Sequence, residues 1–256
     1  MIILGIDTTT RACSVALLED QALLAEFTLN IMKTHSERLM PLIDSALSEC
    51  GVERERVGAV AVAVGPGSFT GLRIGISTAR AFCQALSIPG IAVSTLEALA
   101  LSLPATDHLV CPLLDARRKQ VYSALYSFNY PSTDHQNEGA RTVPFPVINC
   151  ELEPAARGIG QLMEEIQAEE RSVCFLGDGV DSYGQFIMDA PGSGDRIIAP
   201  PTHRYCRASL VAFRGIQLLP GLEHGSYEGV APQYLRLPEA QRIALEKERA
   251  RGGNGA

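Results

Sequence analysis

The hydrophobic positions divide the chain into short, fully apolar runs and longer runs with helical spacing. Residues 57–64 form an unbroken run of valine, alanine and one glycine, which is typical of a strand buried on both faces. Residues 72–86 carry small apolar side chains at helical spacing. Between the two, Gly65, Pro66 and Gly67 favour a tight turn. This stretch therefore predicts a strand, a sharp turn and a helix.

The same patterns predict the elements before residue 104. Thr34 and Glu37 have the spacing of a capping box, as do Ser94 and Glu97, so a helix is expected to begin at each pair. Pro41 should bend the first of these helices, because proline removes one backbone hydrogen bond. The expected strands are 2–6, 12–18, 22–29, 57–64 and 89–93, and the expected helices are 34–50, 72–86 and 94–103.

The second half repeats the alternation of apolar runs and turns. A loop is expected at 129–141, which is rich in Pro, Ser, Asp, Asn and Gly. The expected strands are 109–116, 121–128, 143–149, 173–176 and 197–199, and the expected helices are 159–166 and 205–219. We expect an N-terminal lobe of residues 1–104 plus 205–221, a smaller lobe of 105–204, and an extended tail of 222–256 with a disordered end.

Composition narrows the class of protein. The chain has 256 residues, of which 46% are hydrophobic, and this is ample for a core. Its net charge of −7 argues against a broad nucleic-acid surface, so another chain should supply most of the positive field if RNA is involved. No apolar run approaches the ~18 residues of a membrane span. The seven cysteines are scattered singly, which favours reduced thiols in a cytoplasmic protein.

Two glycine turns are the first candidates for chemistry. A glycine turn that opens a helix can bind an anion, so Gly67 and Ser68 are candidate nucleotide contacts. The phosphate-binding loop of nucleotide hydrolases needs a lysine after its last glycine, however, and Gly71 is followed by Leu72. A packed strand-to-helix turn is therefore the favoured interpretation. Gly177 and Gly179 flank Asp178 at the end of another strand, where a simple turn is again favoured.

One basic cluster stands out, at Arg117, Arg118 and Lys119. Such a cluster in a hairpin is usually a solvated turn, but it is the best local candidate for contact with phosphate. The main catalytic signatures are missing. No two of the five histidines are four residues apart, and no GxSxG, CxxC or HExxH motif occurs. We predict no catalytic residue, no metal site and no cofactor.

Three segments resemble the TsaB family, formerly called YeaZ: GPGSFTGLRIG at 65–75, DARRKQVY at 115–122 and PQYLR at 232–236. The resemblance implies an α/β fold of the actin-like ATPase (ASKHA, ribonuclease-H-like) type, with two lobes that each contain a mixed sheet flanked by helices. In catalytic members of that superfamily, an Asp-x-Gly-Thr turn meets phosphate and metal. Here Asp7 and Thr8 are followed by Thr9 in place of the glycine, so the loop is interpreted as a relic.

The resemblance also implies a function. Members of the family are non-catalytic partners of TsaD and, with TsaE, support threonylcarbamoyl transfer to N6 of adenosine 37 in tRNAs that read ANN codons. We expect the helices at 34–50 and 72–86 to pair with TsaD, or with a second copy when TsaD is absent. The interface residues that we predict are Leu39, Leu42, Ile43, Leu47, Ile76, Ala79 and Phe82.

Two alternatives remain open. The first is a small-molecule kinase or nucleotide hydrolase that uses Asp7 and the two glycine turns. The second is a metallopeptidase, which would need a bound metal.

Overall fold

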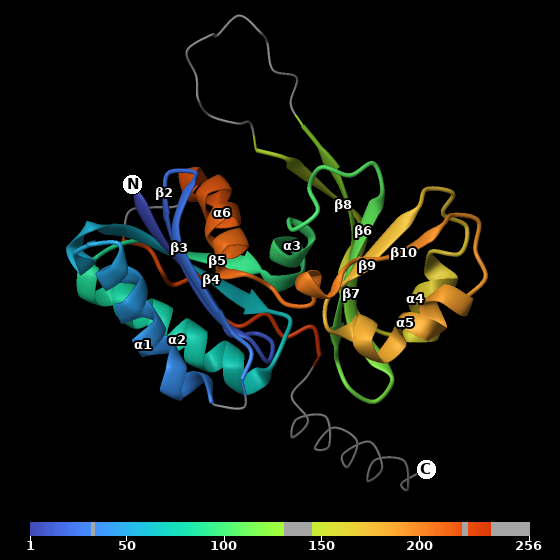
Figure 1. Cartoon of the computed structure of the whole chain (residues 1–256), viewed down its shortest axis with the longest axis horizontal. Helices are drawn as coiled ribbons and strands as arrows, with labels where there is room; N and C mark the ends of the chain where they lie inside the picture. Colours follow the sequence, from blue (N-terminus) through green and yellow to red (C-terminus); the bar gives the residue numbers. More distant parts are fainter. Residues whose placement is uncertain (32–33, 131–144, 222–224, 237–256) are drawn as a thin grey trace, which may run out of the picture.

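The computed structural model describes residues 1–31, 34–130, 145–221 and 225–236, and within them the chain forms two lobes that lie side by side (Figure 1). Each lobe contains a five-stranded sheet. The first sheet consists of β1 (Ile2–Asp7), β2 (Cys13–Glu19), β3 (Ala22–Leu29), β4 (Val57–Gly65) and β5 (Gly90–Ser94). The second consists of β6 (Leu109–Asp115), β7 (Gln120–Asn129), β8 (Val147–Gly158), β9 (Val173–Leu176) and β10 (Arg196–Ile198).

Helices cover these sheets. They are α1 (His35–Glu49), α2 (Phe69–Leu86), α3 (Thr95–Ala100), α4 (Ile159–Glu165), α5 (Gly179–Asp189) and α6 (Ala208–Leu218), with short 3-10 turns at Arg54–Arg56, Pro201–His203 and Leu219–Gly221. Figure 1 shows α1 and α2 on one face of the first sheet and α6 on the other. Helices α4 and α5 lie on the outer side of the second lobe, and α3 lies between the two lobes.

The two sheets share one topology. Their strand orders are β3-β2-β1-β4-β5 and β8-β7-β6-β9-β10. In each sheet the first strand along the chain is central; it pairs antiparallel with the second strand and parallel with the fourth. This is the ribonuclease-H-like arrangement, present twice. The expected fold class, two lobes each with a mixed sheet flanked by helices, is confirmed.

The alternation of valine and alanine along β4 explains how both of its faces are covered. The valines at 60, 62 and 64 pack in the core under α1 and α2, and the alanines at 59, 61 and 63 pack under α6. Small side chains on the second face let α6 approach closely: a Cβ at Gly215 would lie 2.6 Å from the Cβ of Ala61. The apolar run thus builds two cores at once, which is why it contains no polar position.

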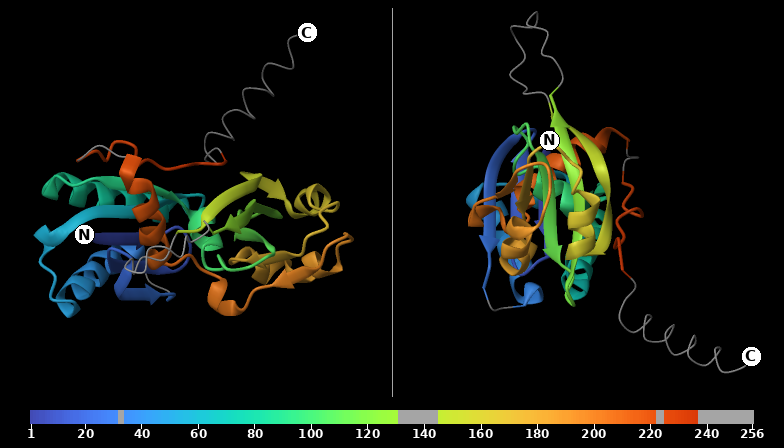
Figure 2. Two further views of the ribbon diagram at one scale, coloured as in Figure 1. Left: turned by 90° about the horizontal axis from the view of Figure 1, so that it is seen from above. Right: turned by 90° about the vertical axis from the view of Figure 1, so that its right-hand side faces the viewer.

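Helix α3 joins the lobes through a shared cluster of buried side chains. Leu96, Leu99 and Ala100 of α3 pack against the second sheet, where Tyr126 is almost fully buried. Figure 2 shows the final segment, 225–236, running along the first lobe towards the second. Its contacts agree, because the Gln233 N–H donates to the Val64 carbonyl at 2.8 Å and Leu235 packs in the second-lobe cluster.

Several local expectations are confirmed, and others need correction. The Ser68 hydroxyl caps α2 by accepting from the Gly71 N–H at 3.2 Å. Helix α2 begins at Phe69, one turn earlier than expected. Strand β8 covers Val147–Gly158, whereas only 143–149 was expected. The parts of the expected loop, strand and tail that fall on 131–144, 222–224 and 237–256 lie outside the described residues.

The largest omission is α5, which was not predicted at all. Val180, Tyr183 and Ile187 pack in the second core and have helical spacing, so the signal was present. It was hidden by the glycine turn at the start of the helix and by Gly184 within it.

Candidate functional site

A cleft of about 1280 Å³ separates the two lobes. One wall comes from the loop after β1 and the first turns of α1 and α2, and the other from the β6–β7 hairpin and the end of the 225–236 segment. Its lining includes Thr9, Thr10, Arg11, His35, Gly67, Ser68, Phe69, Asp115, Arg117, Arg118, Asp178, Tyr234 and Arg236. The structure thus brings several of the sequence candidates to one place, although they come from distant parts of the chain.

Asp7 is completely buried beneath this cleft, and its carboxylate is already engaged. Oδ1 accepts hydrogen bonds from the Thr9 hydroxyl at 2.7 Å and from the Thr9 N–H at 3.2 Å. Thr9, which stands where the Asp-x-Gly-Thr turn has glycine, therefore donates both hydrogen bonds to the Asp7 carboxylate. Burial raises the pKa of Asp7 from its ordinary value of 3.8 to about 7, and the nearby Asp178 charge adds a smaller increase. Oδ2 is buried and has no hydrogen-bond partner.

The glycine turn after β4 is packed directly against the loop after β1. The Ser68 N–H donates to the Thr9 carbonyl at 2.7 Å, and the Thr8 hydroxyl donates to the Gly71 carbonyl at 2.7 Å. A Cβ at Gly71 would lie 2.0 Å from the Thr8 carbonyl oxygen, and one at Gly67 would lie 2.4 Å from the Thr9 carbonyl oxygen. Not even a methyl group fits between the two loops, so the glycines here serve close packing.

The second glycine turn has a similar structural role. Gly177 has a φ of +96°, and its N–H donates to the His203 carbonyl at 2.9 Å. A Cβ at Gly177 would lie 2.1 Å from the Leu113 carbonyl oxygen. The Asp178 carboxylate accepts from the Asp115 N–H at 3.0 Å, and burial raises its pKa from 3.8 to about 6. The turn fastens the end of β9 to the end of β6.

Arg117, Arg118 and Lys119 form the tip of the β6–β7 hairpin and are exposed. All three have left-handed backbone conformations, with φ values of 65°, 55° and 61°. Asp115 supports the turn, because its Oδ1 accepts from the Arg117 N–H at 2.8 Å. Three successive L-residues in this region are sterically unfavourable, and such strain is most often found at functional sites.

The predicted partner-interface residues are mostly inside the molecule. The exposed fraction is 8% or less for six of them: Leu39, Leu42, Ile43, Leu47, Ile76 and Ala79. Phe82 is partly buried against the same core. The expectation that this apolar stripe is an exposed patch is therefore wrong. The sheet itself covers the stripe, because β1, β2 and β4 each present an apolar face to the two helices.

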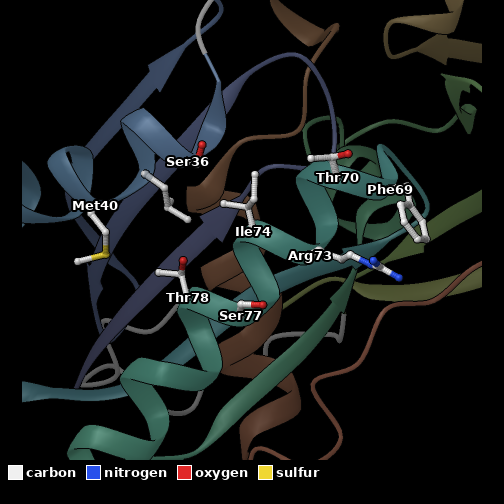
Figure 3. Close-up of a pocket in the computed structure, with 9 residues that line it drawn as sticks. Ser36, Met40, Phe69, Thr70, Arg73, Ile74, Ser77 and Thr78 are labelled. Carbon is white, nitrogen blue, oxygen red and sulfur yellow. The ribbon is translucent and has the colours of Figure 1, made fainter.

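The outer surface of α1 and α2 instead carries a groove of about 520 Å³ (Figure 3). Met40 of α1 lies across the groove from Ile74 and Thr78 of α2. The other lining residues are Ser36, Leu39, Phe69, Thr70, Arg73 and Ser77. The sequence held a signal for this surface: Ile74 lies off the buried stripe of α2, so this helix is apolar on more than one side.

No three His, Cys, Asp or Glu side chains in the described ranges lie close enough together to hold a metal ion. In the same ranges, no helix combines the length and the apolarity needed to cross a bilayer.

Comparison with known proteins gives consistent results. Residues 22–190 match the family model described as "TsaD: tRNA N6-adenosine threonylcarbamoyltransferase". The chain is 34% identical over 249 residues to the tRNA threonylcarbamoyladenosine biosynthesis protein TsaB of Bacillus subtilis, covering 97% of this chain and 100% of that protein.

Two solved structures from Pseudomonas aeruginosa are also similar. One is described as an uncharacterized protein with similarity to peptidase YEAZ; it is 28% identical, has a TM-score of 0.72, and the match covers 92% of this chain and 99% of that one. The other is named YeaZ; it is 26% identical, has a TM-score of 0.68, and the match covers 91% and 99%.

Proposed function

Because the chain belongs to the TsaB family, also called YeaZ, which takes part in the biosynthesis of threonylcarbamoyladenosine in tRNA, we propose that it is a non-catalytic subunit that binds and activates TsaD. In this proposal, TsaD carries out the transfer of the threonylcarbamoyl group to N6 of adenosine 37 in ANN-decoding tRNAs. TsaE engages the pair, and the reaction takes place in the cytoplasm.

The state of the Asp7 loop supports a non-catalytic role. A phosphate or a metal ion would need access to the Asp7 carboxylate, but that group is buried and accepts two hydrogen bonds from Thr9. The glycine turn that would hold phosphates contacts Thr8 and Thr9 instead. These contacts also weigh against the alternative of a kinase or nucleotide hydrolase that uses Asp7. Such an enzyme would need the loop after β1 and the glycine turn after β4 to hold the nucleotide, but here the two loops bond to each other.

The observation that carries the proposed partner role is the groove between α1 and α2. Its α2 side presents Ser77 and Thr78, and small side chains allow the backbone of another helix to approach closely. Met40 is 42% exposed at its edge, which gives a partner an apolar anchor. We therefore place the contact with TsaD on the outer face of these helices, instead of on the buried stripe that the sequence suggested.

A substitution in the groove tests this placement. Ser77→Trp puts a large side chain on the exposed face of α2, so it should abolish co-elution with TsaD on size-exclusion chromatography while leaving the fold intact. Ser182→Trp is the matched control, because Ser182 is an exposed serine of α5 on the other lobe. Normal TsaD binding by Ser77→Trp would contradict the proposed surface. Leu42→Asp and Ile76→Asp would not test the proposed surface, because these residues are 8% and 5% exposed and belong to the core.

The same groove should mediate self-association when TsaD is absent. Light scattering should then find a homodimer for the free chain and a monomer for Ser77→Trp. A dimer that persists in this variant would separate the self-association surface from the proposed one.

A further inference from the structure

Exposed aromatic side chains lie at the mouth of the cleft between the lobes. Tyr234 stacks on Phe69, with ring centroids 5.3 Å apart and an interplanar angle of 29°. The Arg73 guanidinium lies 3.9 Å from the centroid of the Phe69 ring. Phe69 remains 39% exposed and Tyr234 remains 40% exposed. Aromatic rings flanked by arginine are the side chains on which unpaired RNA bases stack.

A basic hairpin faces these rings from the second lobe. Arg117 and Lys119 are exposed at its tip, and Tyr234 and Arg117 line the same cleft. The hairpin is fastened to the segment that carries Tyr234, because Arg236 donates from a guanidinium nitrogen to the Ala116 carbonyl at 3.1 Å. Stacking surface and positive charge are therefore held at a fixed separation by the chain itself.

Acidic groups are also present in the cleft. Glu37 is exposed at the start of α1, where its carboxylate accepts from the Thr34 N–H at 3.2 Å, and two others lie deeper. Asp115 and Asp178 are partly buried, and both accept hydrogen bonds from backbone N–H groups at the base of the hairpin. Arg117 and Lys119 at the tip are exposed. In a chain of net charge −7, the rim is thus a local site of positive charge that attracts phosphate groups.

We propose that this rim, made of Phe69, Arg117, Lys119 and Tyr234, binds single-stranded RNA. Phe69 lines both the cleft and the groove between α1 and α2, so RNA at the rim would lie beside a partner in that groove. Arg117 and Lys119 contact phosphodiester groups, and the Phe69–Tyr234 pair stacks against an unpaired base. The inference rests on the proposed function to the extent that a tRNA held by TsaD is the RNA that reaches the rim. It adds a direct RNA contact by this chain, which its overall negative charge alone does not suggest.

Two variants separate the charge from the stacking. The double variant Arg117→Gly/Lys119→Gly removes both cations and keeps the hairpin, because glycine adopts positive φ without strain. Tyr234→Leu removes one ring and keeps an apolar side chain in its place. Arg54→Ala is the control, since Arg54 is an exposed arginine before β4, at the end of that strand away from the cleft.

Fluorescence anisotropy with a labelled tRNA anticodon stem-loop is measured at several salt concentrations, on the complex with TsaD and on this chain alone. The double variant should bind about tenfold more weakly, and the slope of log K against log salt should become shallower by about 1.4. Tyr234→Leu should bind about fivefold more weakly or worse with an unchanged slope, because stacking releases no counterions. Arg54→Ala should behave as the unsubstituted chain.

Unchanged affinity and slope in both rim variants would overturn the inference. A competition experiment distinguishes an RNA site from a mononucleotide site. Unlabelled RNA should displace the labelled stem-loop, and ATP at equal phosphate concentration should not. Displacement by ATP, together with saturable ATP binding to the chain alone, would make the rim a mononucleotide site and would also overturn the inference. Failure to co-elute with TsaD would reject the proposed function instead, and the measurement on the chain alone would still decide the RNA site.

Discussion

Replacing Asp7 by asparagine tests whether the loop after β1 is only structural. Asp7 is buried, and its pKa of about 7 in the folded chain compares with an ordinary value of 3.8. Between these two values the folded state binds more protons than the unfolded state, so the free energy of unfolding falls as the pH rises. Deprotonated Asp7 is therefore destabilising at neutral pH, and a neutral side chain should relieve the cost.

The shift corresponds to about 4 kcal/mol for the fully ionised carboxylate. About 3 kcal/mol of it develops between pH 5 and pH 8, because the free energy of unfolding falls by about 1.4 kcal/mol per pH unit between the two pKa values and levels off above the folded-state pKa. Asparagine keeps the acceptor oxygen for Thr9 but places an NH2 group where Oδ2 has no partner, and this costs roughly the same at both pH values. The stability of Asp7→Asn relative to the unsubstituted chain should therefore increase by about 3 kcal/mol from pH 5 to pH 8.

Urea unfolding followed by circular dichroism measures this difference, since the chain has no tryptophan. Asp44→Asn, which removes an exposed carboxylate of α1, controls for the change in net charge. A stability difference that is constant or decreases with pH would refute the reasoning, because it would mean that the folded chain stabilises the Asp7 carboxylate. Asp7→Asn should also support TsaD-dependent tRNA modification. Loss of modification by a folded variant would give Asp7 a catalytic role.

Three further substitutions test the packing that holds the site. Gly71→Ala should destabilise the chain by about 1–3 kcal/mol, because its Cβ would meet a carbonyl oxygen at 2.0 Å; a thermal shift of less than 1 °C would contradict the packing role of this glycine. Glu26→Ala should cost about 1–2 kcal/mol, because Glu26 Oε1 accepts from the Ser209 N–H at the start of α6; unfolding in urea measures it, with unchanged stability as the contrary result. Glu165→Ala should cost about 3 kcal/mol, because it leaves the buried Arg157 guanidinium without the carboxylate that lies 2.7 Å away, and a Glu165→Gln variant should recover part of the loss.

Much of the first lobe could be predicted from local patterns. The strand at 57–64, the turn and the helix that Ser68 caps are all present, because each depends on residues that are neighbours in the sequence. The Ser94–Glu97 pair shows the limit of such reasoning. Ser94 caps α3 as expected, but the Glu97 carboxylate pairs with Arg214 of α6 at 2.8 Å. A partner more than a hundred residues away leaves no trace in a local motif.

The candidate site follows the same division. The identity of the loops at Asp7, Gly67 and Gly177 could be found from the sequence, since each is a short motif at the end of a strand. Their mutual packing could not be found, because the contacts that fill the space between Gly71 and Thr8 exist only after β1 and β4 have paired. The repeated topology of the two lobes also left no sequence repeat. The two sheets have the same strand order because their strands pair in the same way, and many unrelated sequences can form the same pairing.

By itself, the sequence determined most of the strands and helices, and that the expected catalytic motifs are incomplete, because these properties depend on the order of side chains along a short stretch. Helix α5 and most of β8 are the exceptions. Only the tertiary structure decided which side of α1 and α2 is exposed. A stripe such as Leu39, Ile43 and Ile76 shows that one side of a helix is apolar, but a sheet of the same chain and a second protein bury such a side equally well. Here the sheet buries it, and the groove beside Met40 and Ser77 is what remains exposed.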